Sequence, residues 1–157
     1  MKWTFGTALH KRMARDERIV LLWADVGKTM FASHFRDYPD RCINPGICEQ
    51  ATVSLAAGLA MEGYRPIVYT ITPFLIERAF EQIKLDVDQM NLPVGLVGYS
   101  DDSAGPTHIE RDAKLISSLW PNVCRFFPET KIGLQVMMTE IPFDRPWFLA
   151  LKPAPSL

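Results

Sequence analysis

The stretch that decides the fold is residues 44–71, which read NPGICEQATVSLAAGLAMEGYRPIVYTI. Its first three residues predict a turn, and residues 47–61 predict a helix whose many small apolar side chains are buried on most sides. Gly63 stands where a helix favourably ends. The run at 67–71 is apolar without alternation, which predicts a strand covered on both faces. Small side chains let another backbone approach, so the helix is expected to pack within its own domain or against a second subunit.

Similar units lie on both sides of this stretch. Short apolar runs alternate with longer helical segments, and this alternation predicts a single α/β domain over residues 1–157 with a mainly parallel sheet in a three-layer α/β/α arrangement. The further strands are expected at 19–23, 94–97, 123–127 and 147–151, and the further helices at 1–15, 74–90 and 107–120.

Two helix starts are indicated by capping patterns. Thr72 followed by Pro73 predicts a capped helix with proline in its first turn. Thr107 and Glu110 have the spacing of a capping box. Pro121 predicts that the second of these helices ends near residue 120, because proline disfavours a helical residue before it.

The composition excludes several classes of protein. The chain has 157 residues, 48% hydrophobic and 22% charged, with a net charge of -1, which gives no basic footprint for nucleic acid or an anionic membrane. Its three cysteines are too few and too widely spaced for a disulfide framework. No apolar run approaches the ~18 residues of a membrane span. We therefore expect a cytoplasmic protein that binds neither nucleic acid nor membrane.

Candidate site residues follow the predicted strands, because ligands of open parallel sheets bind beyond the carboxyl ends of the strands. Glu49 begins the buried helix, where a carboxylate either complements the helix dipole or faces a ligand nitrogen. His108, at a predicted helix start, is either a surface residue or a proton donor or acceptor. Phe74 is either core or a stacking platform for a ring.

Several motifs resemble one family when they are taken in order. Residues 40–50, DRCINPGICEQ, are similar to the transketolase pattern PDRFxNxGIxEQ. The other matching segments are FGTAL at 5–9, ADVG at 24–27, AAGLAMEGYRP at 56–66, RAFEQI at 78–83 and GPTH at 105–108. The chain therefore resembles, over nearly its whole length, the pyrimidine-binding domain of transketolases and 1-deoxyxylulose-5-phosphate synthases.

This resemblance implies a thiamine-diphosphate site. Glu49 matches the glutamate that hydrogen-bonds the aminopyrimidine and so promotes deprotonation of the thiazolium carbon. Phe74 would stack on that ring, although Phe80 is an alternative because the segment before RAF is one residue longer than the family pattern. His108 would bond the substrate, and Asp25 and Ile47 would help to bind the cofactor.

Two departures from the family pattern limit the resemblance. Ala104 replaces the aspartate that precedes GPTH in transketolases, so recognition of a sugar hydroxyl at this position is not implied. The printed sequence contains no GDG motif for the cofactor's phosphates and Mg²⁺. We therefore expect no metal ligand in this chain and a separate diphosphate-binding subunit as partner, in a heterotetramer.

Three functions remain open from the sequence. The first is ketol or aldehyde transfer from a ketose. The second is a decarboxylating reaction of a 2-oxoacid, as in 1-deoxyxylulose-5-phosphate synthase or the β half of a 2-oxoacid dehydrogenase. The third is a relic that only binds a partner.

Overall fold

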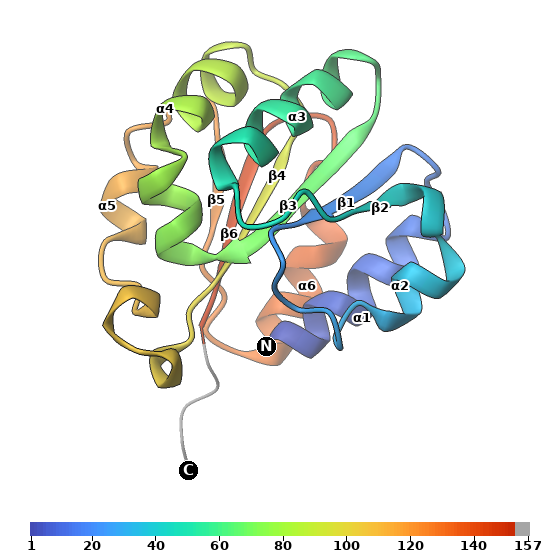
Figure 1. Cartoon of the computed structure of the whole chain (residues 1–157), viewed down its shortest axis with the longest axis horizontal. Helices are drawn as coiled ribbons and strands as arrows, with labels where there is room; N and C mark the ends of the chain where they lie inside the picture. Colours follow the sequence, from blue (N-terminus) through green and yellow to red (C-terminus); the bar gives the residue numbers. More distant parts are fainter. Residues whose placement is uncertain (153–157) are drawn as a thin grey trace.

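In the computed structural model, residues 1–152 are described, and they form one parallel sheet with helices on both of its faces (Figure 1). The strand order is β2-β1-β3-β4-β6-β5, and every neighbouring pair is parallel. The strands are β1 (Ile19–Trp23), β2 (Cys42–Ile43), β3 (Arg65–Ile71), β4 (Gly95–Tyr99), β5 (Cys124–Phe126) and β6 (Trp147–Leu151).

The helices form the two outer layers. Helices α1 and α6 cover one face of the sheet, and α3 lies on the other with the helical segment that follows β3 and with α5 (Figure 1). The predicted three-layer α/β/α fold is therefore confirmed. The helices are α1 (Lys2–Met13), α2 (Ala32–Asp37), α3 (Glu49–Met61), α4 (Phe80–Gln82), α5 (Ala113–Ser117) and α6 (Lys131–Glu140). Shorter 3₁₀ and π-helical turns are η1 (Pro39–Arg41), η2 (Phe74–Arg78), η3 (Ile83–Gln89), η4 (Asp102–Ala104) and η5 (Pro106–His108).

Each continuous apolar run supplies side chains to two separate hydrophobic cores, one on each face of the sheet. In β1, Val20 and Leu22 pack beneath α3, whereas Ile19 and Leu21 pack beneath α1. Successive side chains of a strand point to opposite faces, so a strand covered on both sides needs apolar residues at every position. All five predicted strands are present, and the additional strand β2 has only two residues.

One predicted helix start is wrong, and one predicted cap does not form. The helix expected from Thr107 begins at Ala113 instead, where the carboxylate of Glu110 accepts the backbone N–H of Ala113 at 2.6 Å. The hydroxyl of Thr72 is buried and has no hydrogen-bond partner among the described residues, so it does not act as a cap. Helices α2 and α6 were not predicted.

The segment after β3 is helical, but much of it is not α-helical. Residues Phe74–Arg78 and Ile83–Gln89 form π-helical turns on either side of the short helix α4. Wide turns of this kind accommodate an extra residue and often lie at functional sites. The one-residue surplus noted in the sequence before RAF is therefore taken up inside the helix.

Helix α3 is buried on one side and exposed on the other. Val53, Ala56 and Ala60 pack into the core, whereas Leu55 and Met61 are 42% and 64% exposed. A side chain added at Gly58 would meet nothing within 4 Å. One face of α3 therefore packs within its own domain, and the other face is free in the isolated chain to pack against a second subunit.

Candidate functional site

Glu49 is a buried carboxylate at the start of α3. It is 4% exposed, and it follows the turn at Gly46, which has a φ of 89° that favours glycine. The hydroxyl of Thr70, near the carboxyl end of β3, lies 3.5 Å from Glu49 Oε1, and Arg78 Nη1 lies 3.3 Å from Oε2. Both distances exceed the ~2.7–2.9 Å of strong charge-assisted bonds. The carboxylate therefore retains the capacity to accept a better-placed donor.

Arg78 connects Glu49 to an aromatic platform. The guanidinium carbon of Arg78 lies 3.7 Å from the centroid of the Phe74 ring. Phe74 in turn contacts His108 edge to face, with ring centroids 4.8 Å apart. The structure thus links Glu49, Phe74 and His108 through Arg78 into one continuous cluster.

Phe80, the alternative to Phe74, lies elsewhere. Its ring packs against Trp120 with centroids 5.6 Å apart, at the edge of the core beneath α3. It is therefore a packing residue, and Phe74 is the aromatic side chain next to the Glu49 cluster.

His108 is carried by a tight loop after β4. Gly105 has a φ of 110°, a backbone conformation that residues other than glycine rarely adopt. Its carbonyl accepts the N–H of His108 at 3.0 Å. The Asp101 N–H donates to the His108 carbonyl at 3.3 Å. The Thr107 hydroxyl lies 3.1 Å from His108 Nδ1, and Ala104 is exposed in the same loop. These contacts fix the position of the imidazole beside Phe74.

Asp25 and Ile47 lie on the loops around Glu49, in different roles. Asn44 Nδ2 donates to the Asp25 carboxylate at 3.0 Å, and Asn44 Oδ1 accepts the N–H groups of Asp25 and Gly46. Asp25 therefore braces the loop after β1 against the turn that precedes Glu49. Ile47 is 70% exposed, two residues before Glu49.

Sequence reasoning missed Thr70 and Arg78. Thr70 was visible as a polar residue inside an otherwise apolar strand, next to the carboxyl end where ligands bind. Arg78 belongs to the motif RAFEQI, which by itself indicates no role for the arginine. Among residues 1–152, no group of three or more His, Cys, Asp or Glu side chains could hold a metal ion. No helix in that range is long and apolar enough to cross a membrane.

The cluster suits a flat group that carries N–H donors. A buried carboxylate beside an aromatic face can bond such a donor while the ring stacks on its plane. The guanidinium of Arg78, which is planar, makes both of these contacts in the isolated chain.

Comparison with known proteins gives consistent matches. A family model described as "Transketolase, pyrimidine binding domain" matches residues 1–142. The 1-deoxy-D-xylulose-5-phosphate synthase 1 of Geobacter metallireducens is 41% identical over 155 residues, which is 90% of this chain and 23% of that protein. The corresponding synthase of Nitratidesulfovibrio vulgaris is 38% identical over 152 residues, with coverages of 90% and 23%. The chain therefore spans about a quarter of the length of these relatives.

Solved structures agree with the fold. A structure described as "Split gene transketolase, inactive beta4 tetramer" has a TM-score of 0.82 and 28% identity, over 95% of this chain and 50% of that one. A transketolase from Campylobacter jejuni has a TM-score of 0.79 and 18% identity, over 95% of this chain and 25% of that one, and so shares the fold.

Proposed function

Because the chain belongs to the family of transketolase pyrimidine-binding domains, we propose that it forms the pyrimidine half of a thiamine-diphosphate site in a transferase. The observation that carries the proposal is the bridge that Arg78 makes between the Glu49 carboxylate and the Phe74 ring. An aminopyrimidine has the same two requirements as a guanidinium, namely an acceptor for its N–H groups and a surface on which its plane can stack. Arg78 thus stands in for the ring, and it must move when the cofactor binds.

Each residue of the cluster has a distinct role in this proposal. Glu49 bonds a nitrogen of the pyrimidine, Phe74 stacks on the ring, and His108 bonds the substrate. The cofactor supplies the carbanion chemistry when it is bound, while the protein holds and tunes it. Asp25 contributes by holding the turn before Glu49, and Ile47 contributes an exposed apolar contact beside the carboxylate.

We propose that the phosphates of the cofactor and Mg²⁺ are held by a separate chain with a diphosphate-binding domain. One of the similar solved structures is a split-gene transketolase, which supports division of such an enzyme between chains. The exposed face of α3 supports a partner surface, because its Leu55, Gly58 and Met61 carry no charge. Two copies of each chain would form the expected heterotetramer.

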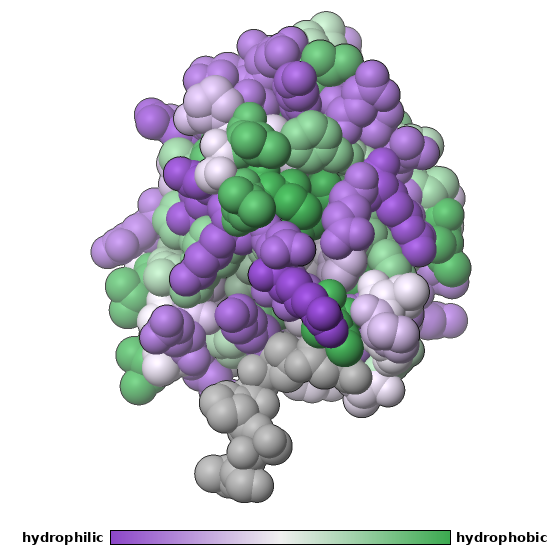
Figure 2. All heavy atoms as spheres, turned by 90° about the vertical axis from the view of Figure 1, so that its left-hand side faces the viewer, coloured by the Kyte–Doolittle hydropathy of each residue, from purple (hydrophilic) through white to green (hydrophobic). Residues whose placement is uncertain are grey.

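The partner surface extends to the side of the molecule that carries α4 and α5. Figure 2 shows a hydrophobic patch within a hydrophilic surround on that side. Leu115 in α5 is 67% exposed, Leu119 beyond it is 58% exposed, and Leu85 in η3 is 42% exposed. An exposed hydrophobic patch such as the one in Figure 2 often marks a contact with another protein.

The first candidate reaction is ketol or aldehyde transfer, in which one carbon–carbon bond of a ketose is cleaved and one is formed with an aldehyde. The second is the decarboxylating reaction of a 1-deoxyxylulose-5-phosphate synthase. The identities of 38–41% to synthases of that name support the second. Release of CO₂ from pyruvate in the presence of an aldehyde would select the decarboxylating reaction, and consumption of a ketose without CO₂ would select transfer.

Calorimetric titration tests the shared site. Thiamine diphosphate and Mg²⁺ are titrated into this chain alone, into the diphosphate-binding chain alone and into their mixture. Saturable binding that is much tighter in the mixture is the expected result. A stable complex of the two chains that never affects cofactor binding would contradict the proposal and would support the relic.

A further inference from the structure

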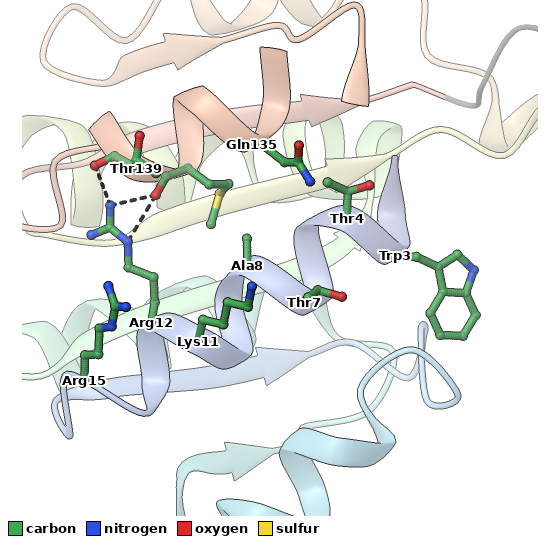
Figure 3. A pocket seen from close by; sticks show the side chains of 10 residues that line it. Trp3, Thr4, Thr7, Ala8, Lys11, Arg12, Arg15, Gln135 and Thr139 are labelled. Atoms are coloured by element: carbon green, nitrogen blue, oxygen red, sulfur yellow. Dashed lines mark hydrogen bonds between the residues drawn. The ribbon is translucent and has the colours of Figure 1, made fainter. Parts of the chain in front are cut away.

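A hollow lies on the opposite face of the sheet from Glu49. It is a groove of about 530 Å³ between α1 and α6 (Figure 3), a volume within the usual ~300–1,000 Å³ range of ligand pockets. Because α1 and α6 cover one face and α3 the other, the groove is separated from the Glu49 cluster by the sheet. Its lining includes Trp3, Thr4, Thr7, Lys11, Arg12 and Arg15.

One end of the groove is strongly cationic. Lys11, Arg12 and Arg15 line it, and no carboxylate is among the lining residues. Burial, followed by the charge of nearby Arg15, lowers the pKa of Arg12. Within the described part of the chain, neither Lys11 nor Arg15 forms an ion pair or a side-chain hydrogen bond. Lys11 and Arg15 are therefore cations without a paired carboxylate, whereas the charge of Asp16 partly offsets that of Arg12.

Arg12 is the fixed member of this group. Its Nε donates to the Met138 carbonyl at 3.1 Å, and its Nη2 donates to the Met138 and Thr139 carbonyls at 2.7 and 2.9 Å. These carbonyls belong to the last turn of α6, which carries partial negative charge. The Nη1 group of Arg12 remains free to donate, because a guanidinium has five N–H groups. The groove thus has one cation, Arg12, that is hydrogen-bonded to α6, beside two exposed cations without side-chain partners.

The other end of the groove is aromatic and hydroxylic. Trp3 is 57% exposed there, next to Thr4 and Thr7, and Figure 3 shows it at the far end of α1 from Arg15. Trp3 and Arg15 are twelve positions apart, and α1 spans most of that separation, which gives roughly 18 Å at ~1.5 Å per residue. An indole offers a stacking face, and the threonine hydroxyls offer hydrogen bonds.

We propose that this groove binds an organic phosphate, specifically a nucleoside diphosphate or a molecule of the same chemistry. Its phosphate groups lie among Lys11, Arg12 and Arg15, and its ring lies toward Trp3. Clustered cations suit a multiply charged phosphate better than a single carboxylate, and arginine binds phosphate through paired N–H groups. The site is independent of the thiamine-diphosphate proposal, because it uses neither the same residues nor the same face of the sheet.

The test is calorimetric titration of ADP into the 157-residue chain without Mg²⁺ and without a partner chain, compared with inorganic phosphate as the second probe. We expect saturable binding of ADP, weakened by added salt, and weaker binding of phosphate alone. The double variant Lys11→Ala/Arg15→Ala is expected to raise the Kd of ADP by about tenfold or more, since it removes two charge-assisted contacts. The matched control Lys84→Ala/Arg125→Ala removes two exposed cations that do not line the groove, and it should leave the Kd unchanged.

The variant Trp3→Ala tests the ring end separately, and it is expected to weaken ADP but not inorganic phosphate. Circular dichroism confirms that each variant is folded. The proposal is overturned if ADP shows no saturable binding, or if the Lys11/Arg15 variant binds ADP as the parent does. Equal affinity for ADP and inorganic phosphate would also overturn it, because the groove would then recognise only an adventitious anion.

Discussion

The guanidinium of Arg78 lies over the ring of Phe74, 3.7 Å from its centroid, and the same side chain reaches Glu49 at 3.3 Å. One residue thus occupies both contacts that the proposed function assigns to a pyrimidine. Glu49 is 4% exposed but Arg78 is 48% exposed, so the cation can leave toward solvent while the carboxylate stays in place. In the isolated chain, the buried charge is compensated by a group that a ligand can displace.

The first prediction concerns this pair. Arg78→Ala should lower the free energy of unfolding of the isolated chain by about 1 kcal/mol, because Glu49 then remains buried without a cation, and the half-exposed arginine limits the loss. In the background of Glu49→Gln, the same arginine change should cost much less. Urea denaturation of the four proteins gives the coupling free energy. Equal costs in both backgrounds would mean that the ion pair does not contribute to stability.

The second prediction concerns catalysis. Glu49→Gln should reduce turnover of the assembled enzyme by at least about 100-fold, since it removes the carboxylate that the proposal places on the pyrimidine while keeping its shape. Complex formation, followed by size-exclusion chromatography, should be unchanged. Glu62→Gln, at the exposed end of the same helix, is the control and should retain full turnover. Normal turnover of the Glu49 variant would sink the proposed role.

The third prediction concerns the turn after β3 that leads to Phe74. A Cβ atom added at Gly98 would lie 2.5 Å from Thr72 Oγ1 and 2.9 Å from Thr72 Cα. Gly98→Ala should therefore displace the turn and destabilise the chain by about 1–3 kcal/mol. In contrast, Gly58→Ala on the exposed side of α3 meets no atom within 4 Å and should stabilise the chain by up to about 1 kcal/mol. Chemical denaturation of both variants measures these changes in stability. A neutral Gly98→Ala variant would refute this explanation.

The strands were predicted from the sequence more accurately than the helix boundaries, because burial on both faces of the sheet requires a recognisable apolar run. Strands such as residues 19–23 face apolar neighbours on both sides, and a continuous apolar run is therefore required wherever such a strand occurs. The start of α5 depends instead on whether Thr107 or Glu110 reaches a backbone N–H, and only the folded loop decides that in favour of Glu110. Thr130 was the sequence signal for the start of helix α6. In the structure it caps that helix by accepting the N–H of Gly133 at 3.0 Å.

The site was predicted in part for a similar reason. Glu49, Phe74 and His108 each follow a strand or a turn, and the order of strands in the sheet brings those ends together. The bridge through Arg78 could not be predicted, because it depends on the π-helical turns that set the direction of side chains between Phe74 and Arg78. The sequence showed only that this segment was one residue longer than the family pattern.

The fourth prediction concerns substrate choice. Ala104→Asp restores the aspartate that precedes GPTH in the transketolase pattern, at an exposed position in the loop that carries His108. If the enzyme is a ketol transferase with an altered sugar site, the change should lower the KM for a ketose donor several-fold with little effect on the unfolding free energy. Ala104→Asn supplies a similar volume without the charge. An unchanged KM in both variants would favour the decarboxylating reaction.

The last prediction concerns the stability of the fold in acid. His34 is 1% exposed, and burial, with the charge of neighbouring His10, lowers its pKa from 6.5 to about 4. Well above pH 6.5 the imidazole is neutral in both the folded and the unfolded state, so it adds no pH dependence there. Between pH 6.5 and about 4 the unfolded chain binds a proton that the folded chain excludes, and the unfolding free energy should fall by about 3 kcal/mol in total.

The loss of unfolding free energy caused by His34 can be distinguished from the loss caused by protonation of the carboxylates. The pKa of Asp37 is lowered to about 2 by its bonds to Arg36 and His10, so its contribution is lost only below pH 4. His34→Leu should therefore flatten the curve of unfolding free energy between pH 6.5 and 4 and leave the steeper fall below pH 4. Denaturant titrations at half-unit pH steps measure this, and an identical slope in the His34 variant would show that another group excludes the proton.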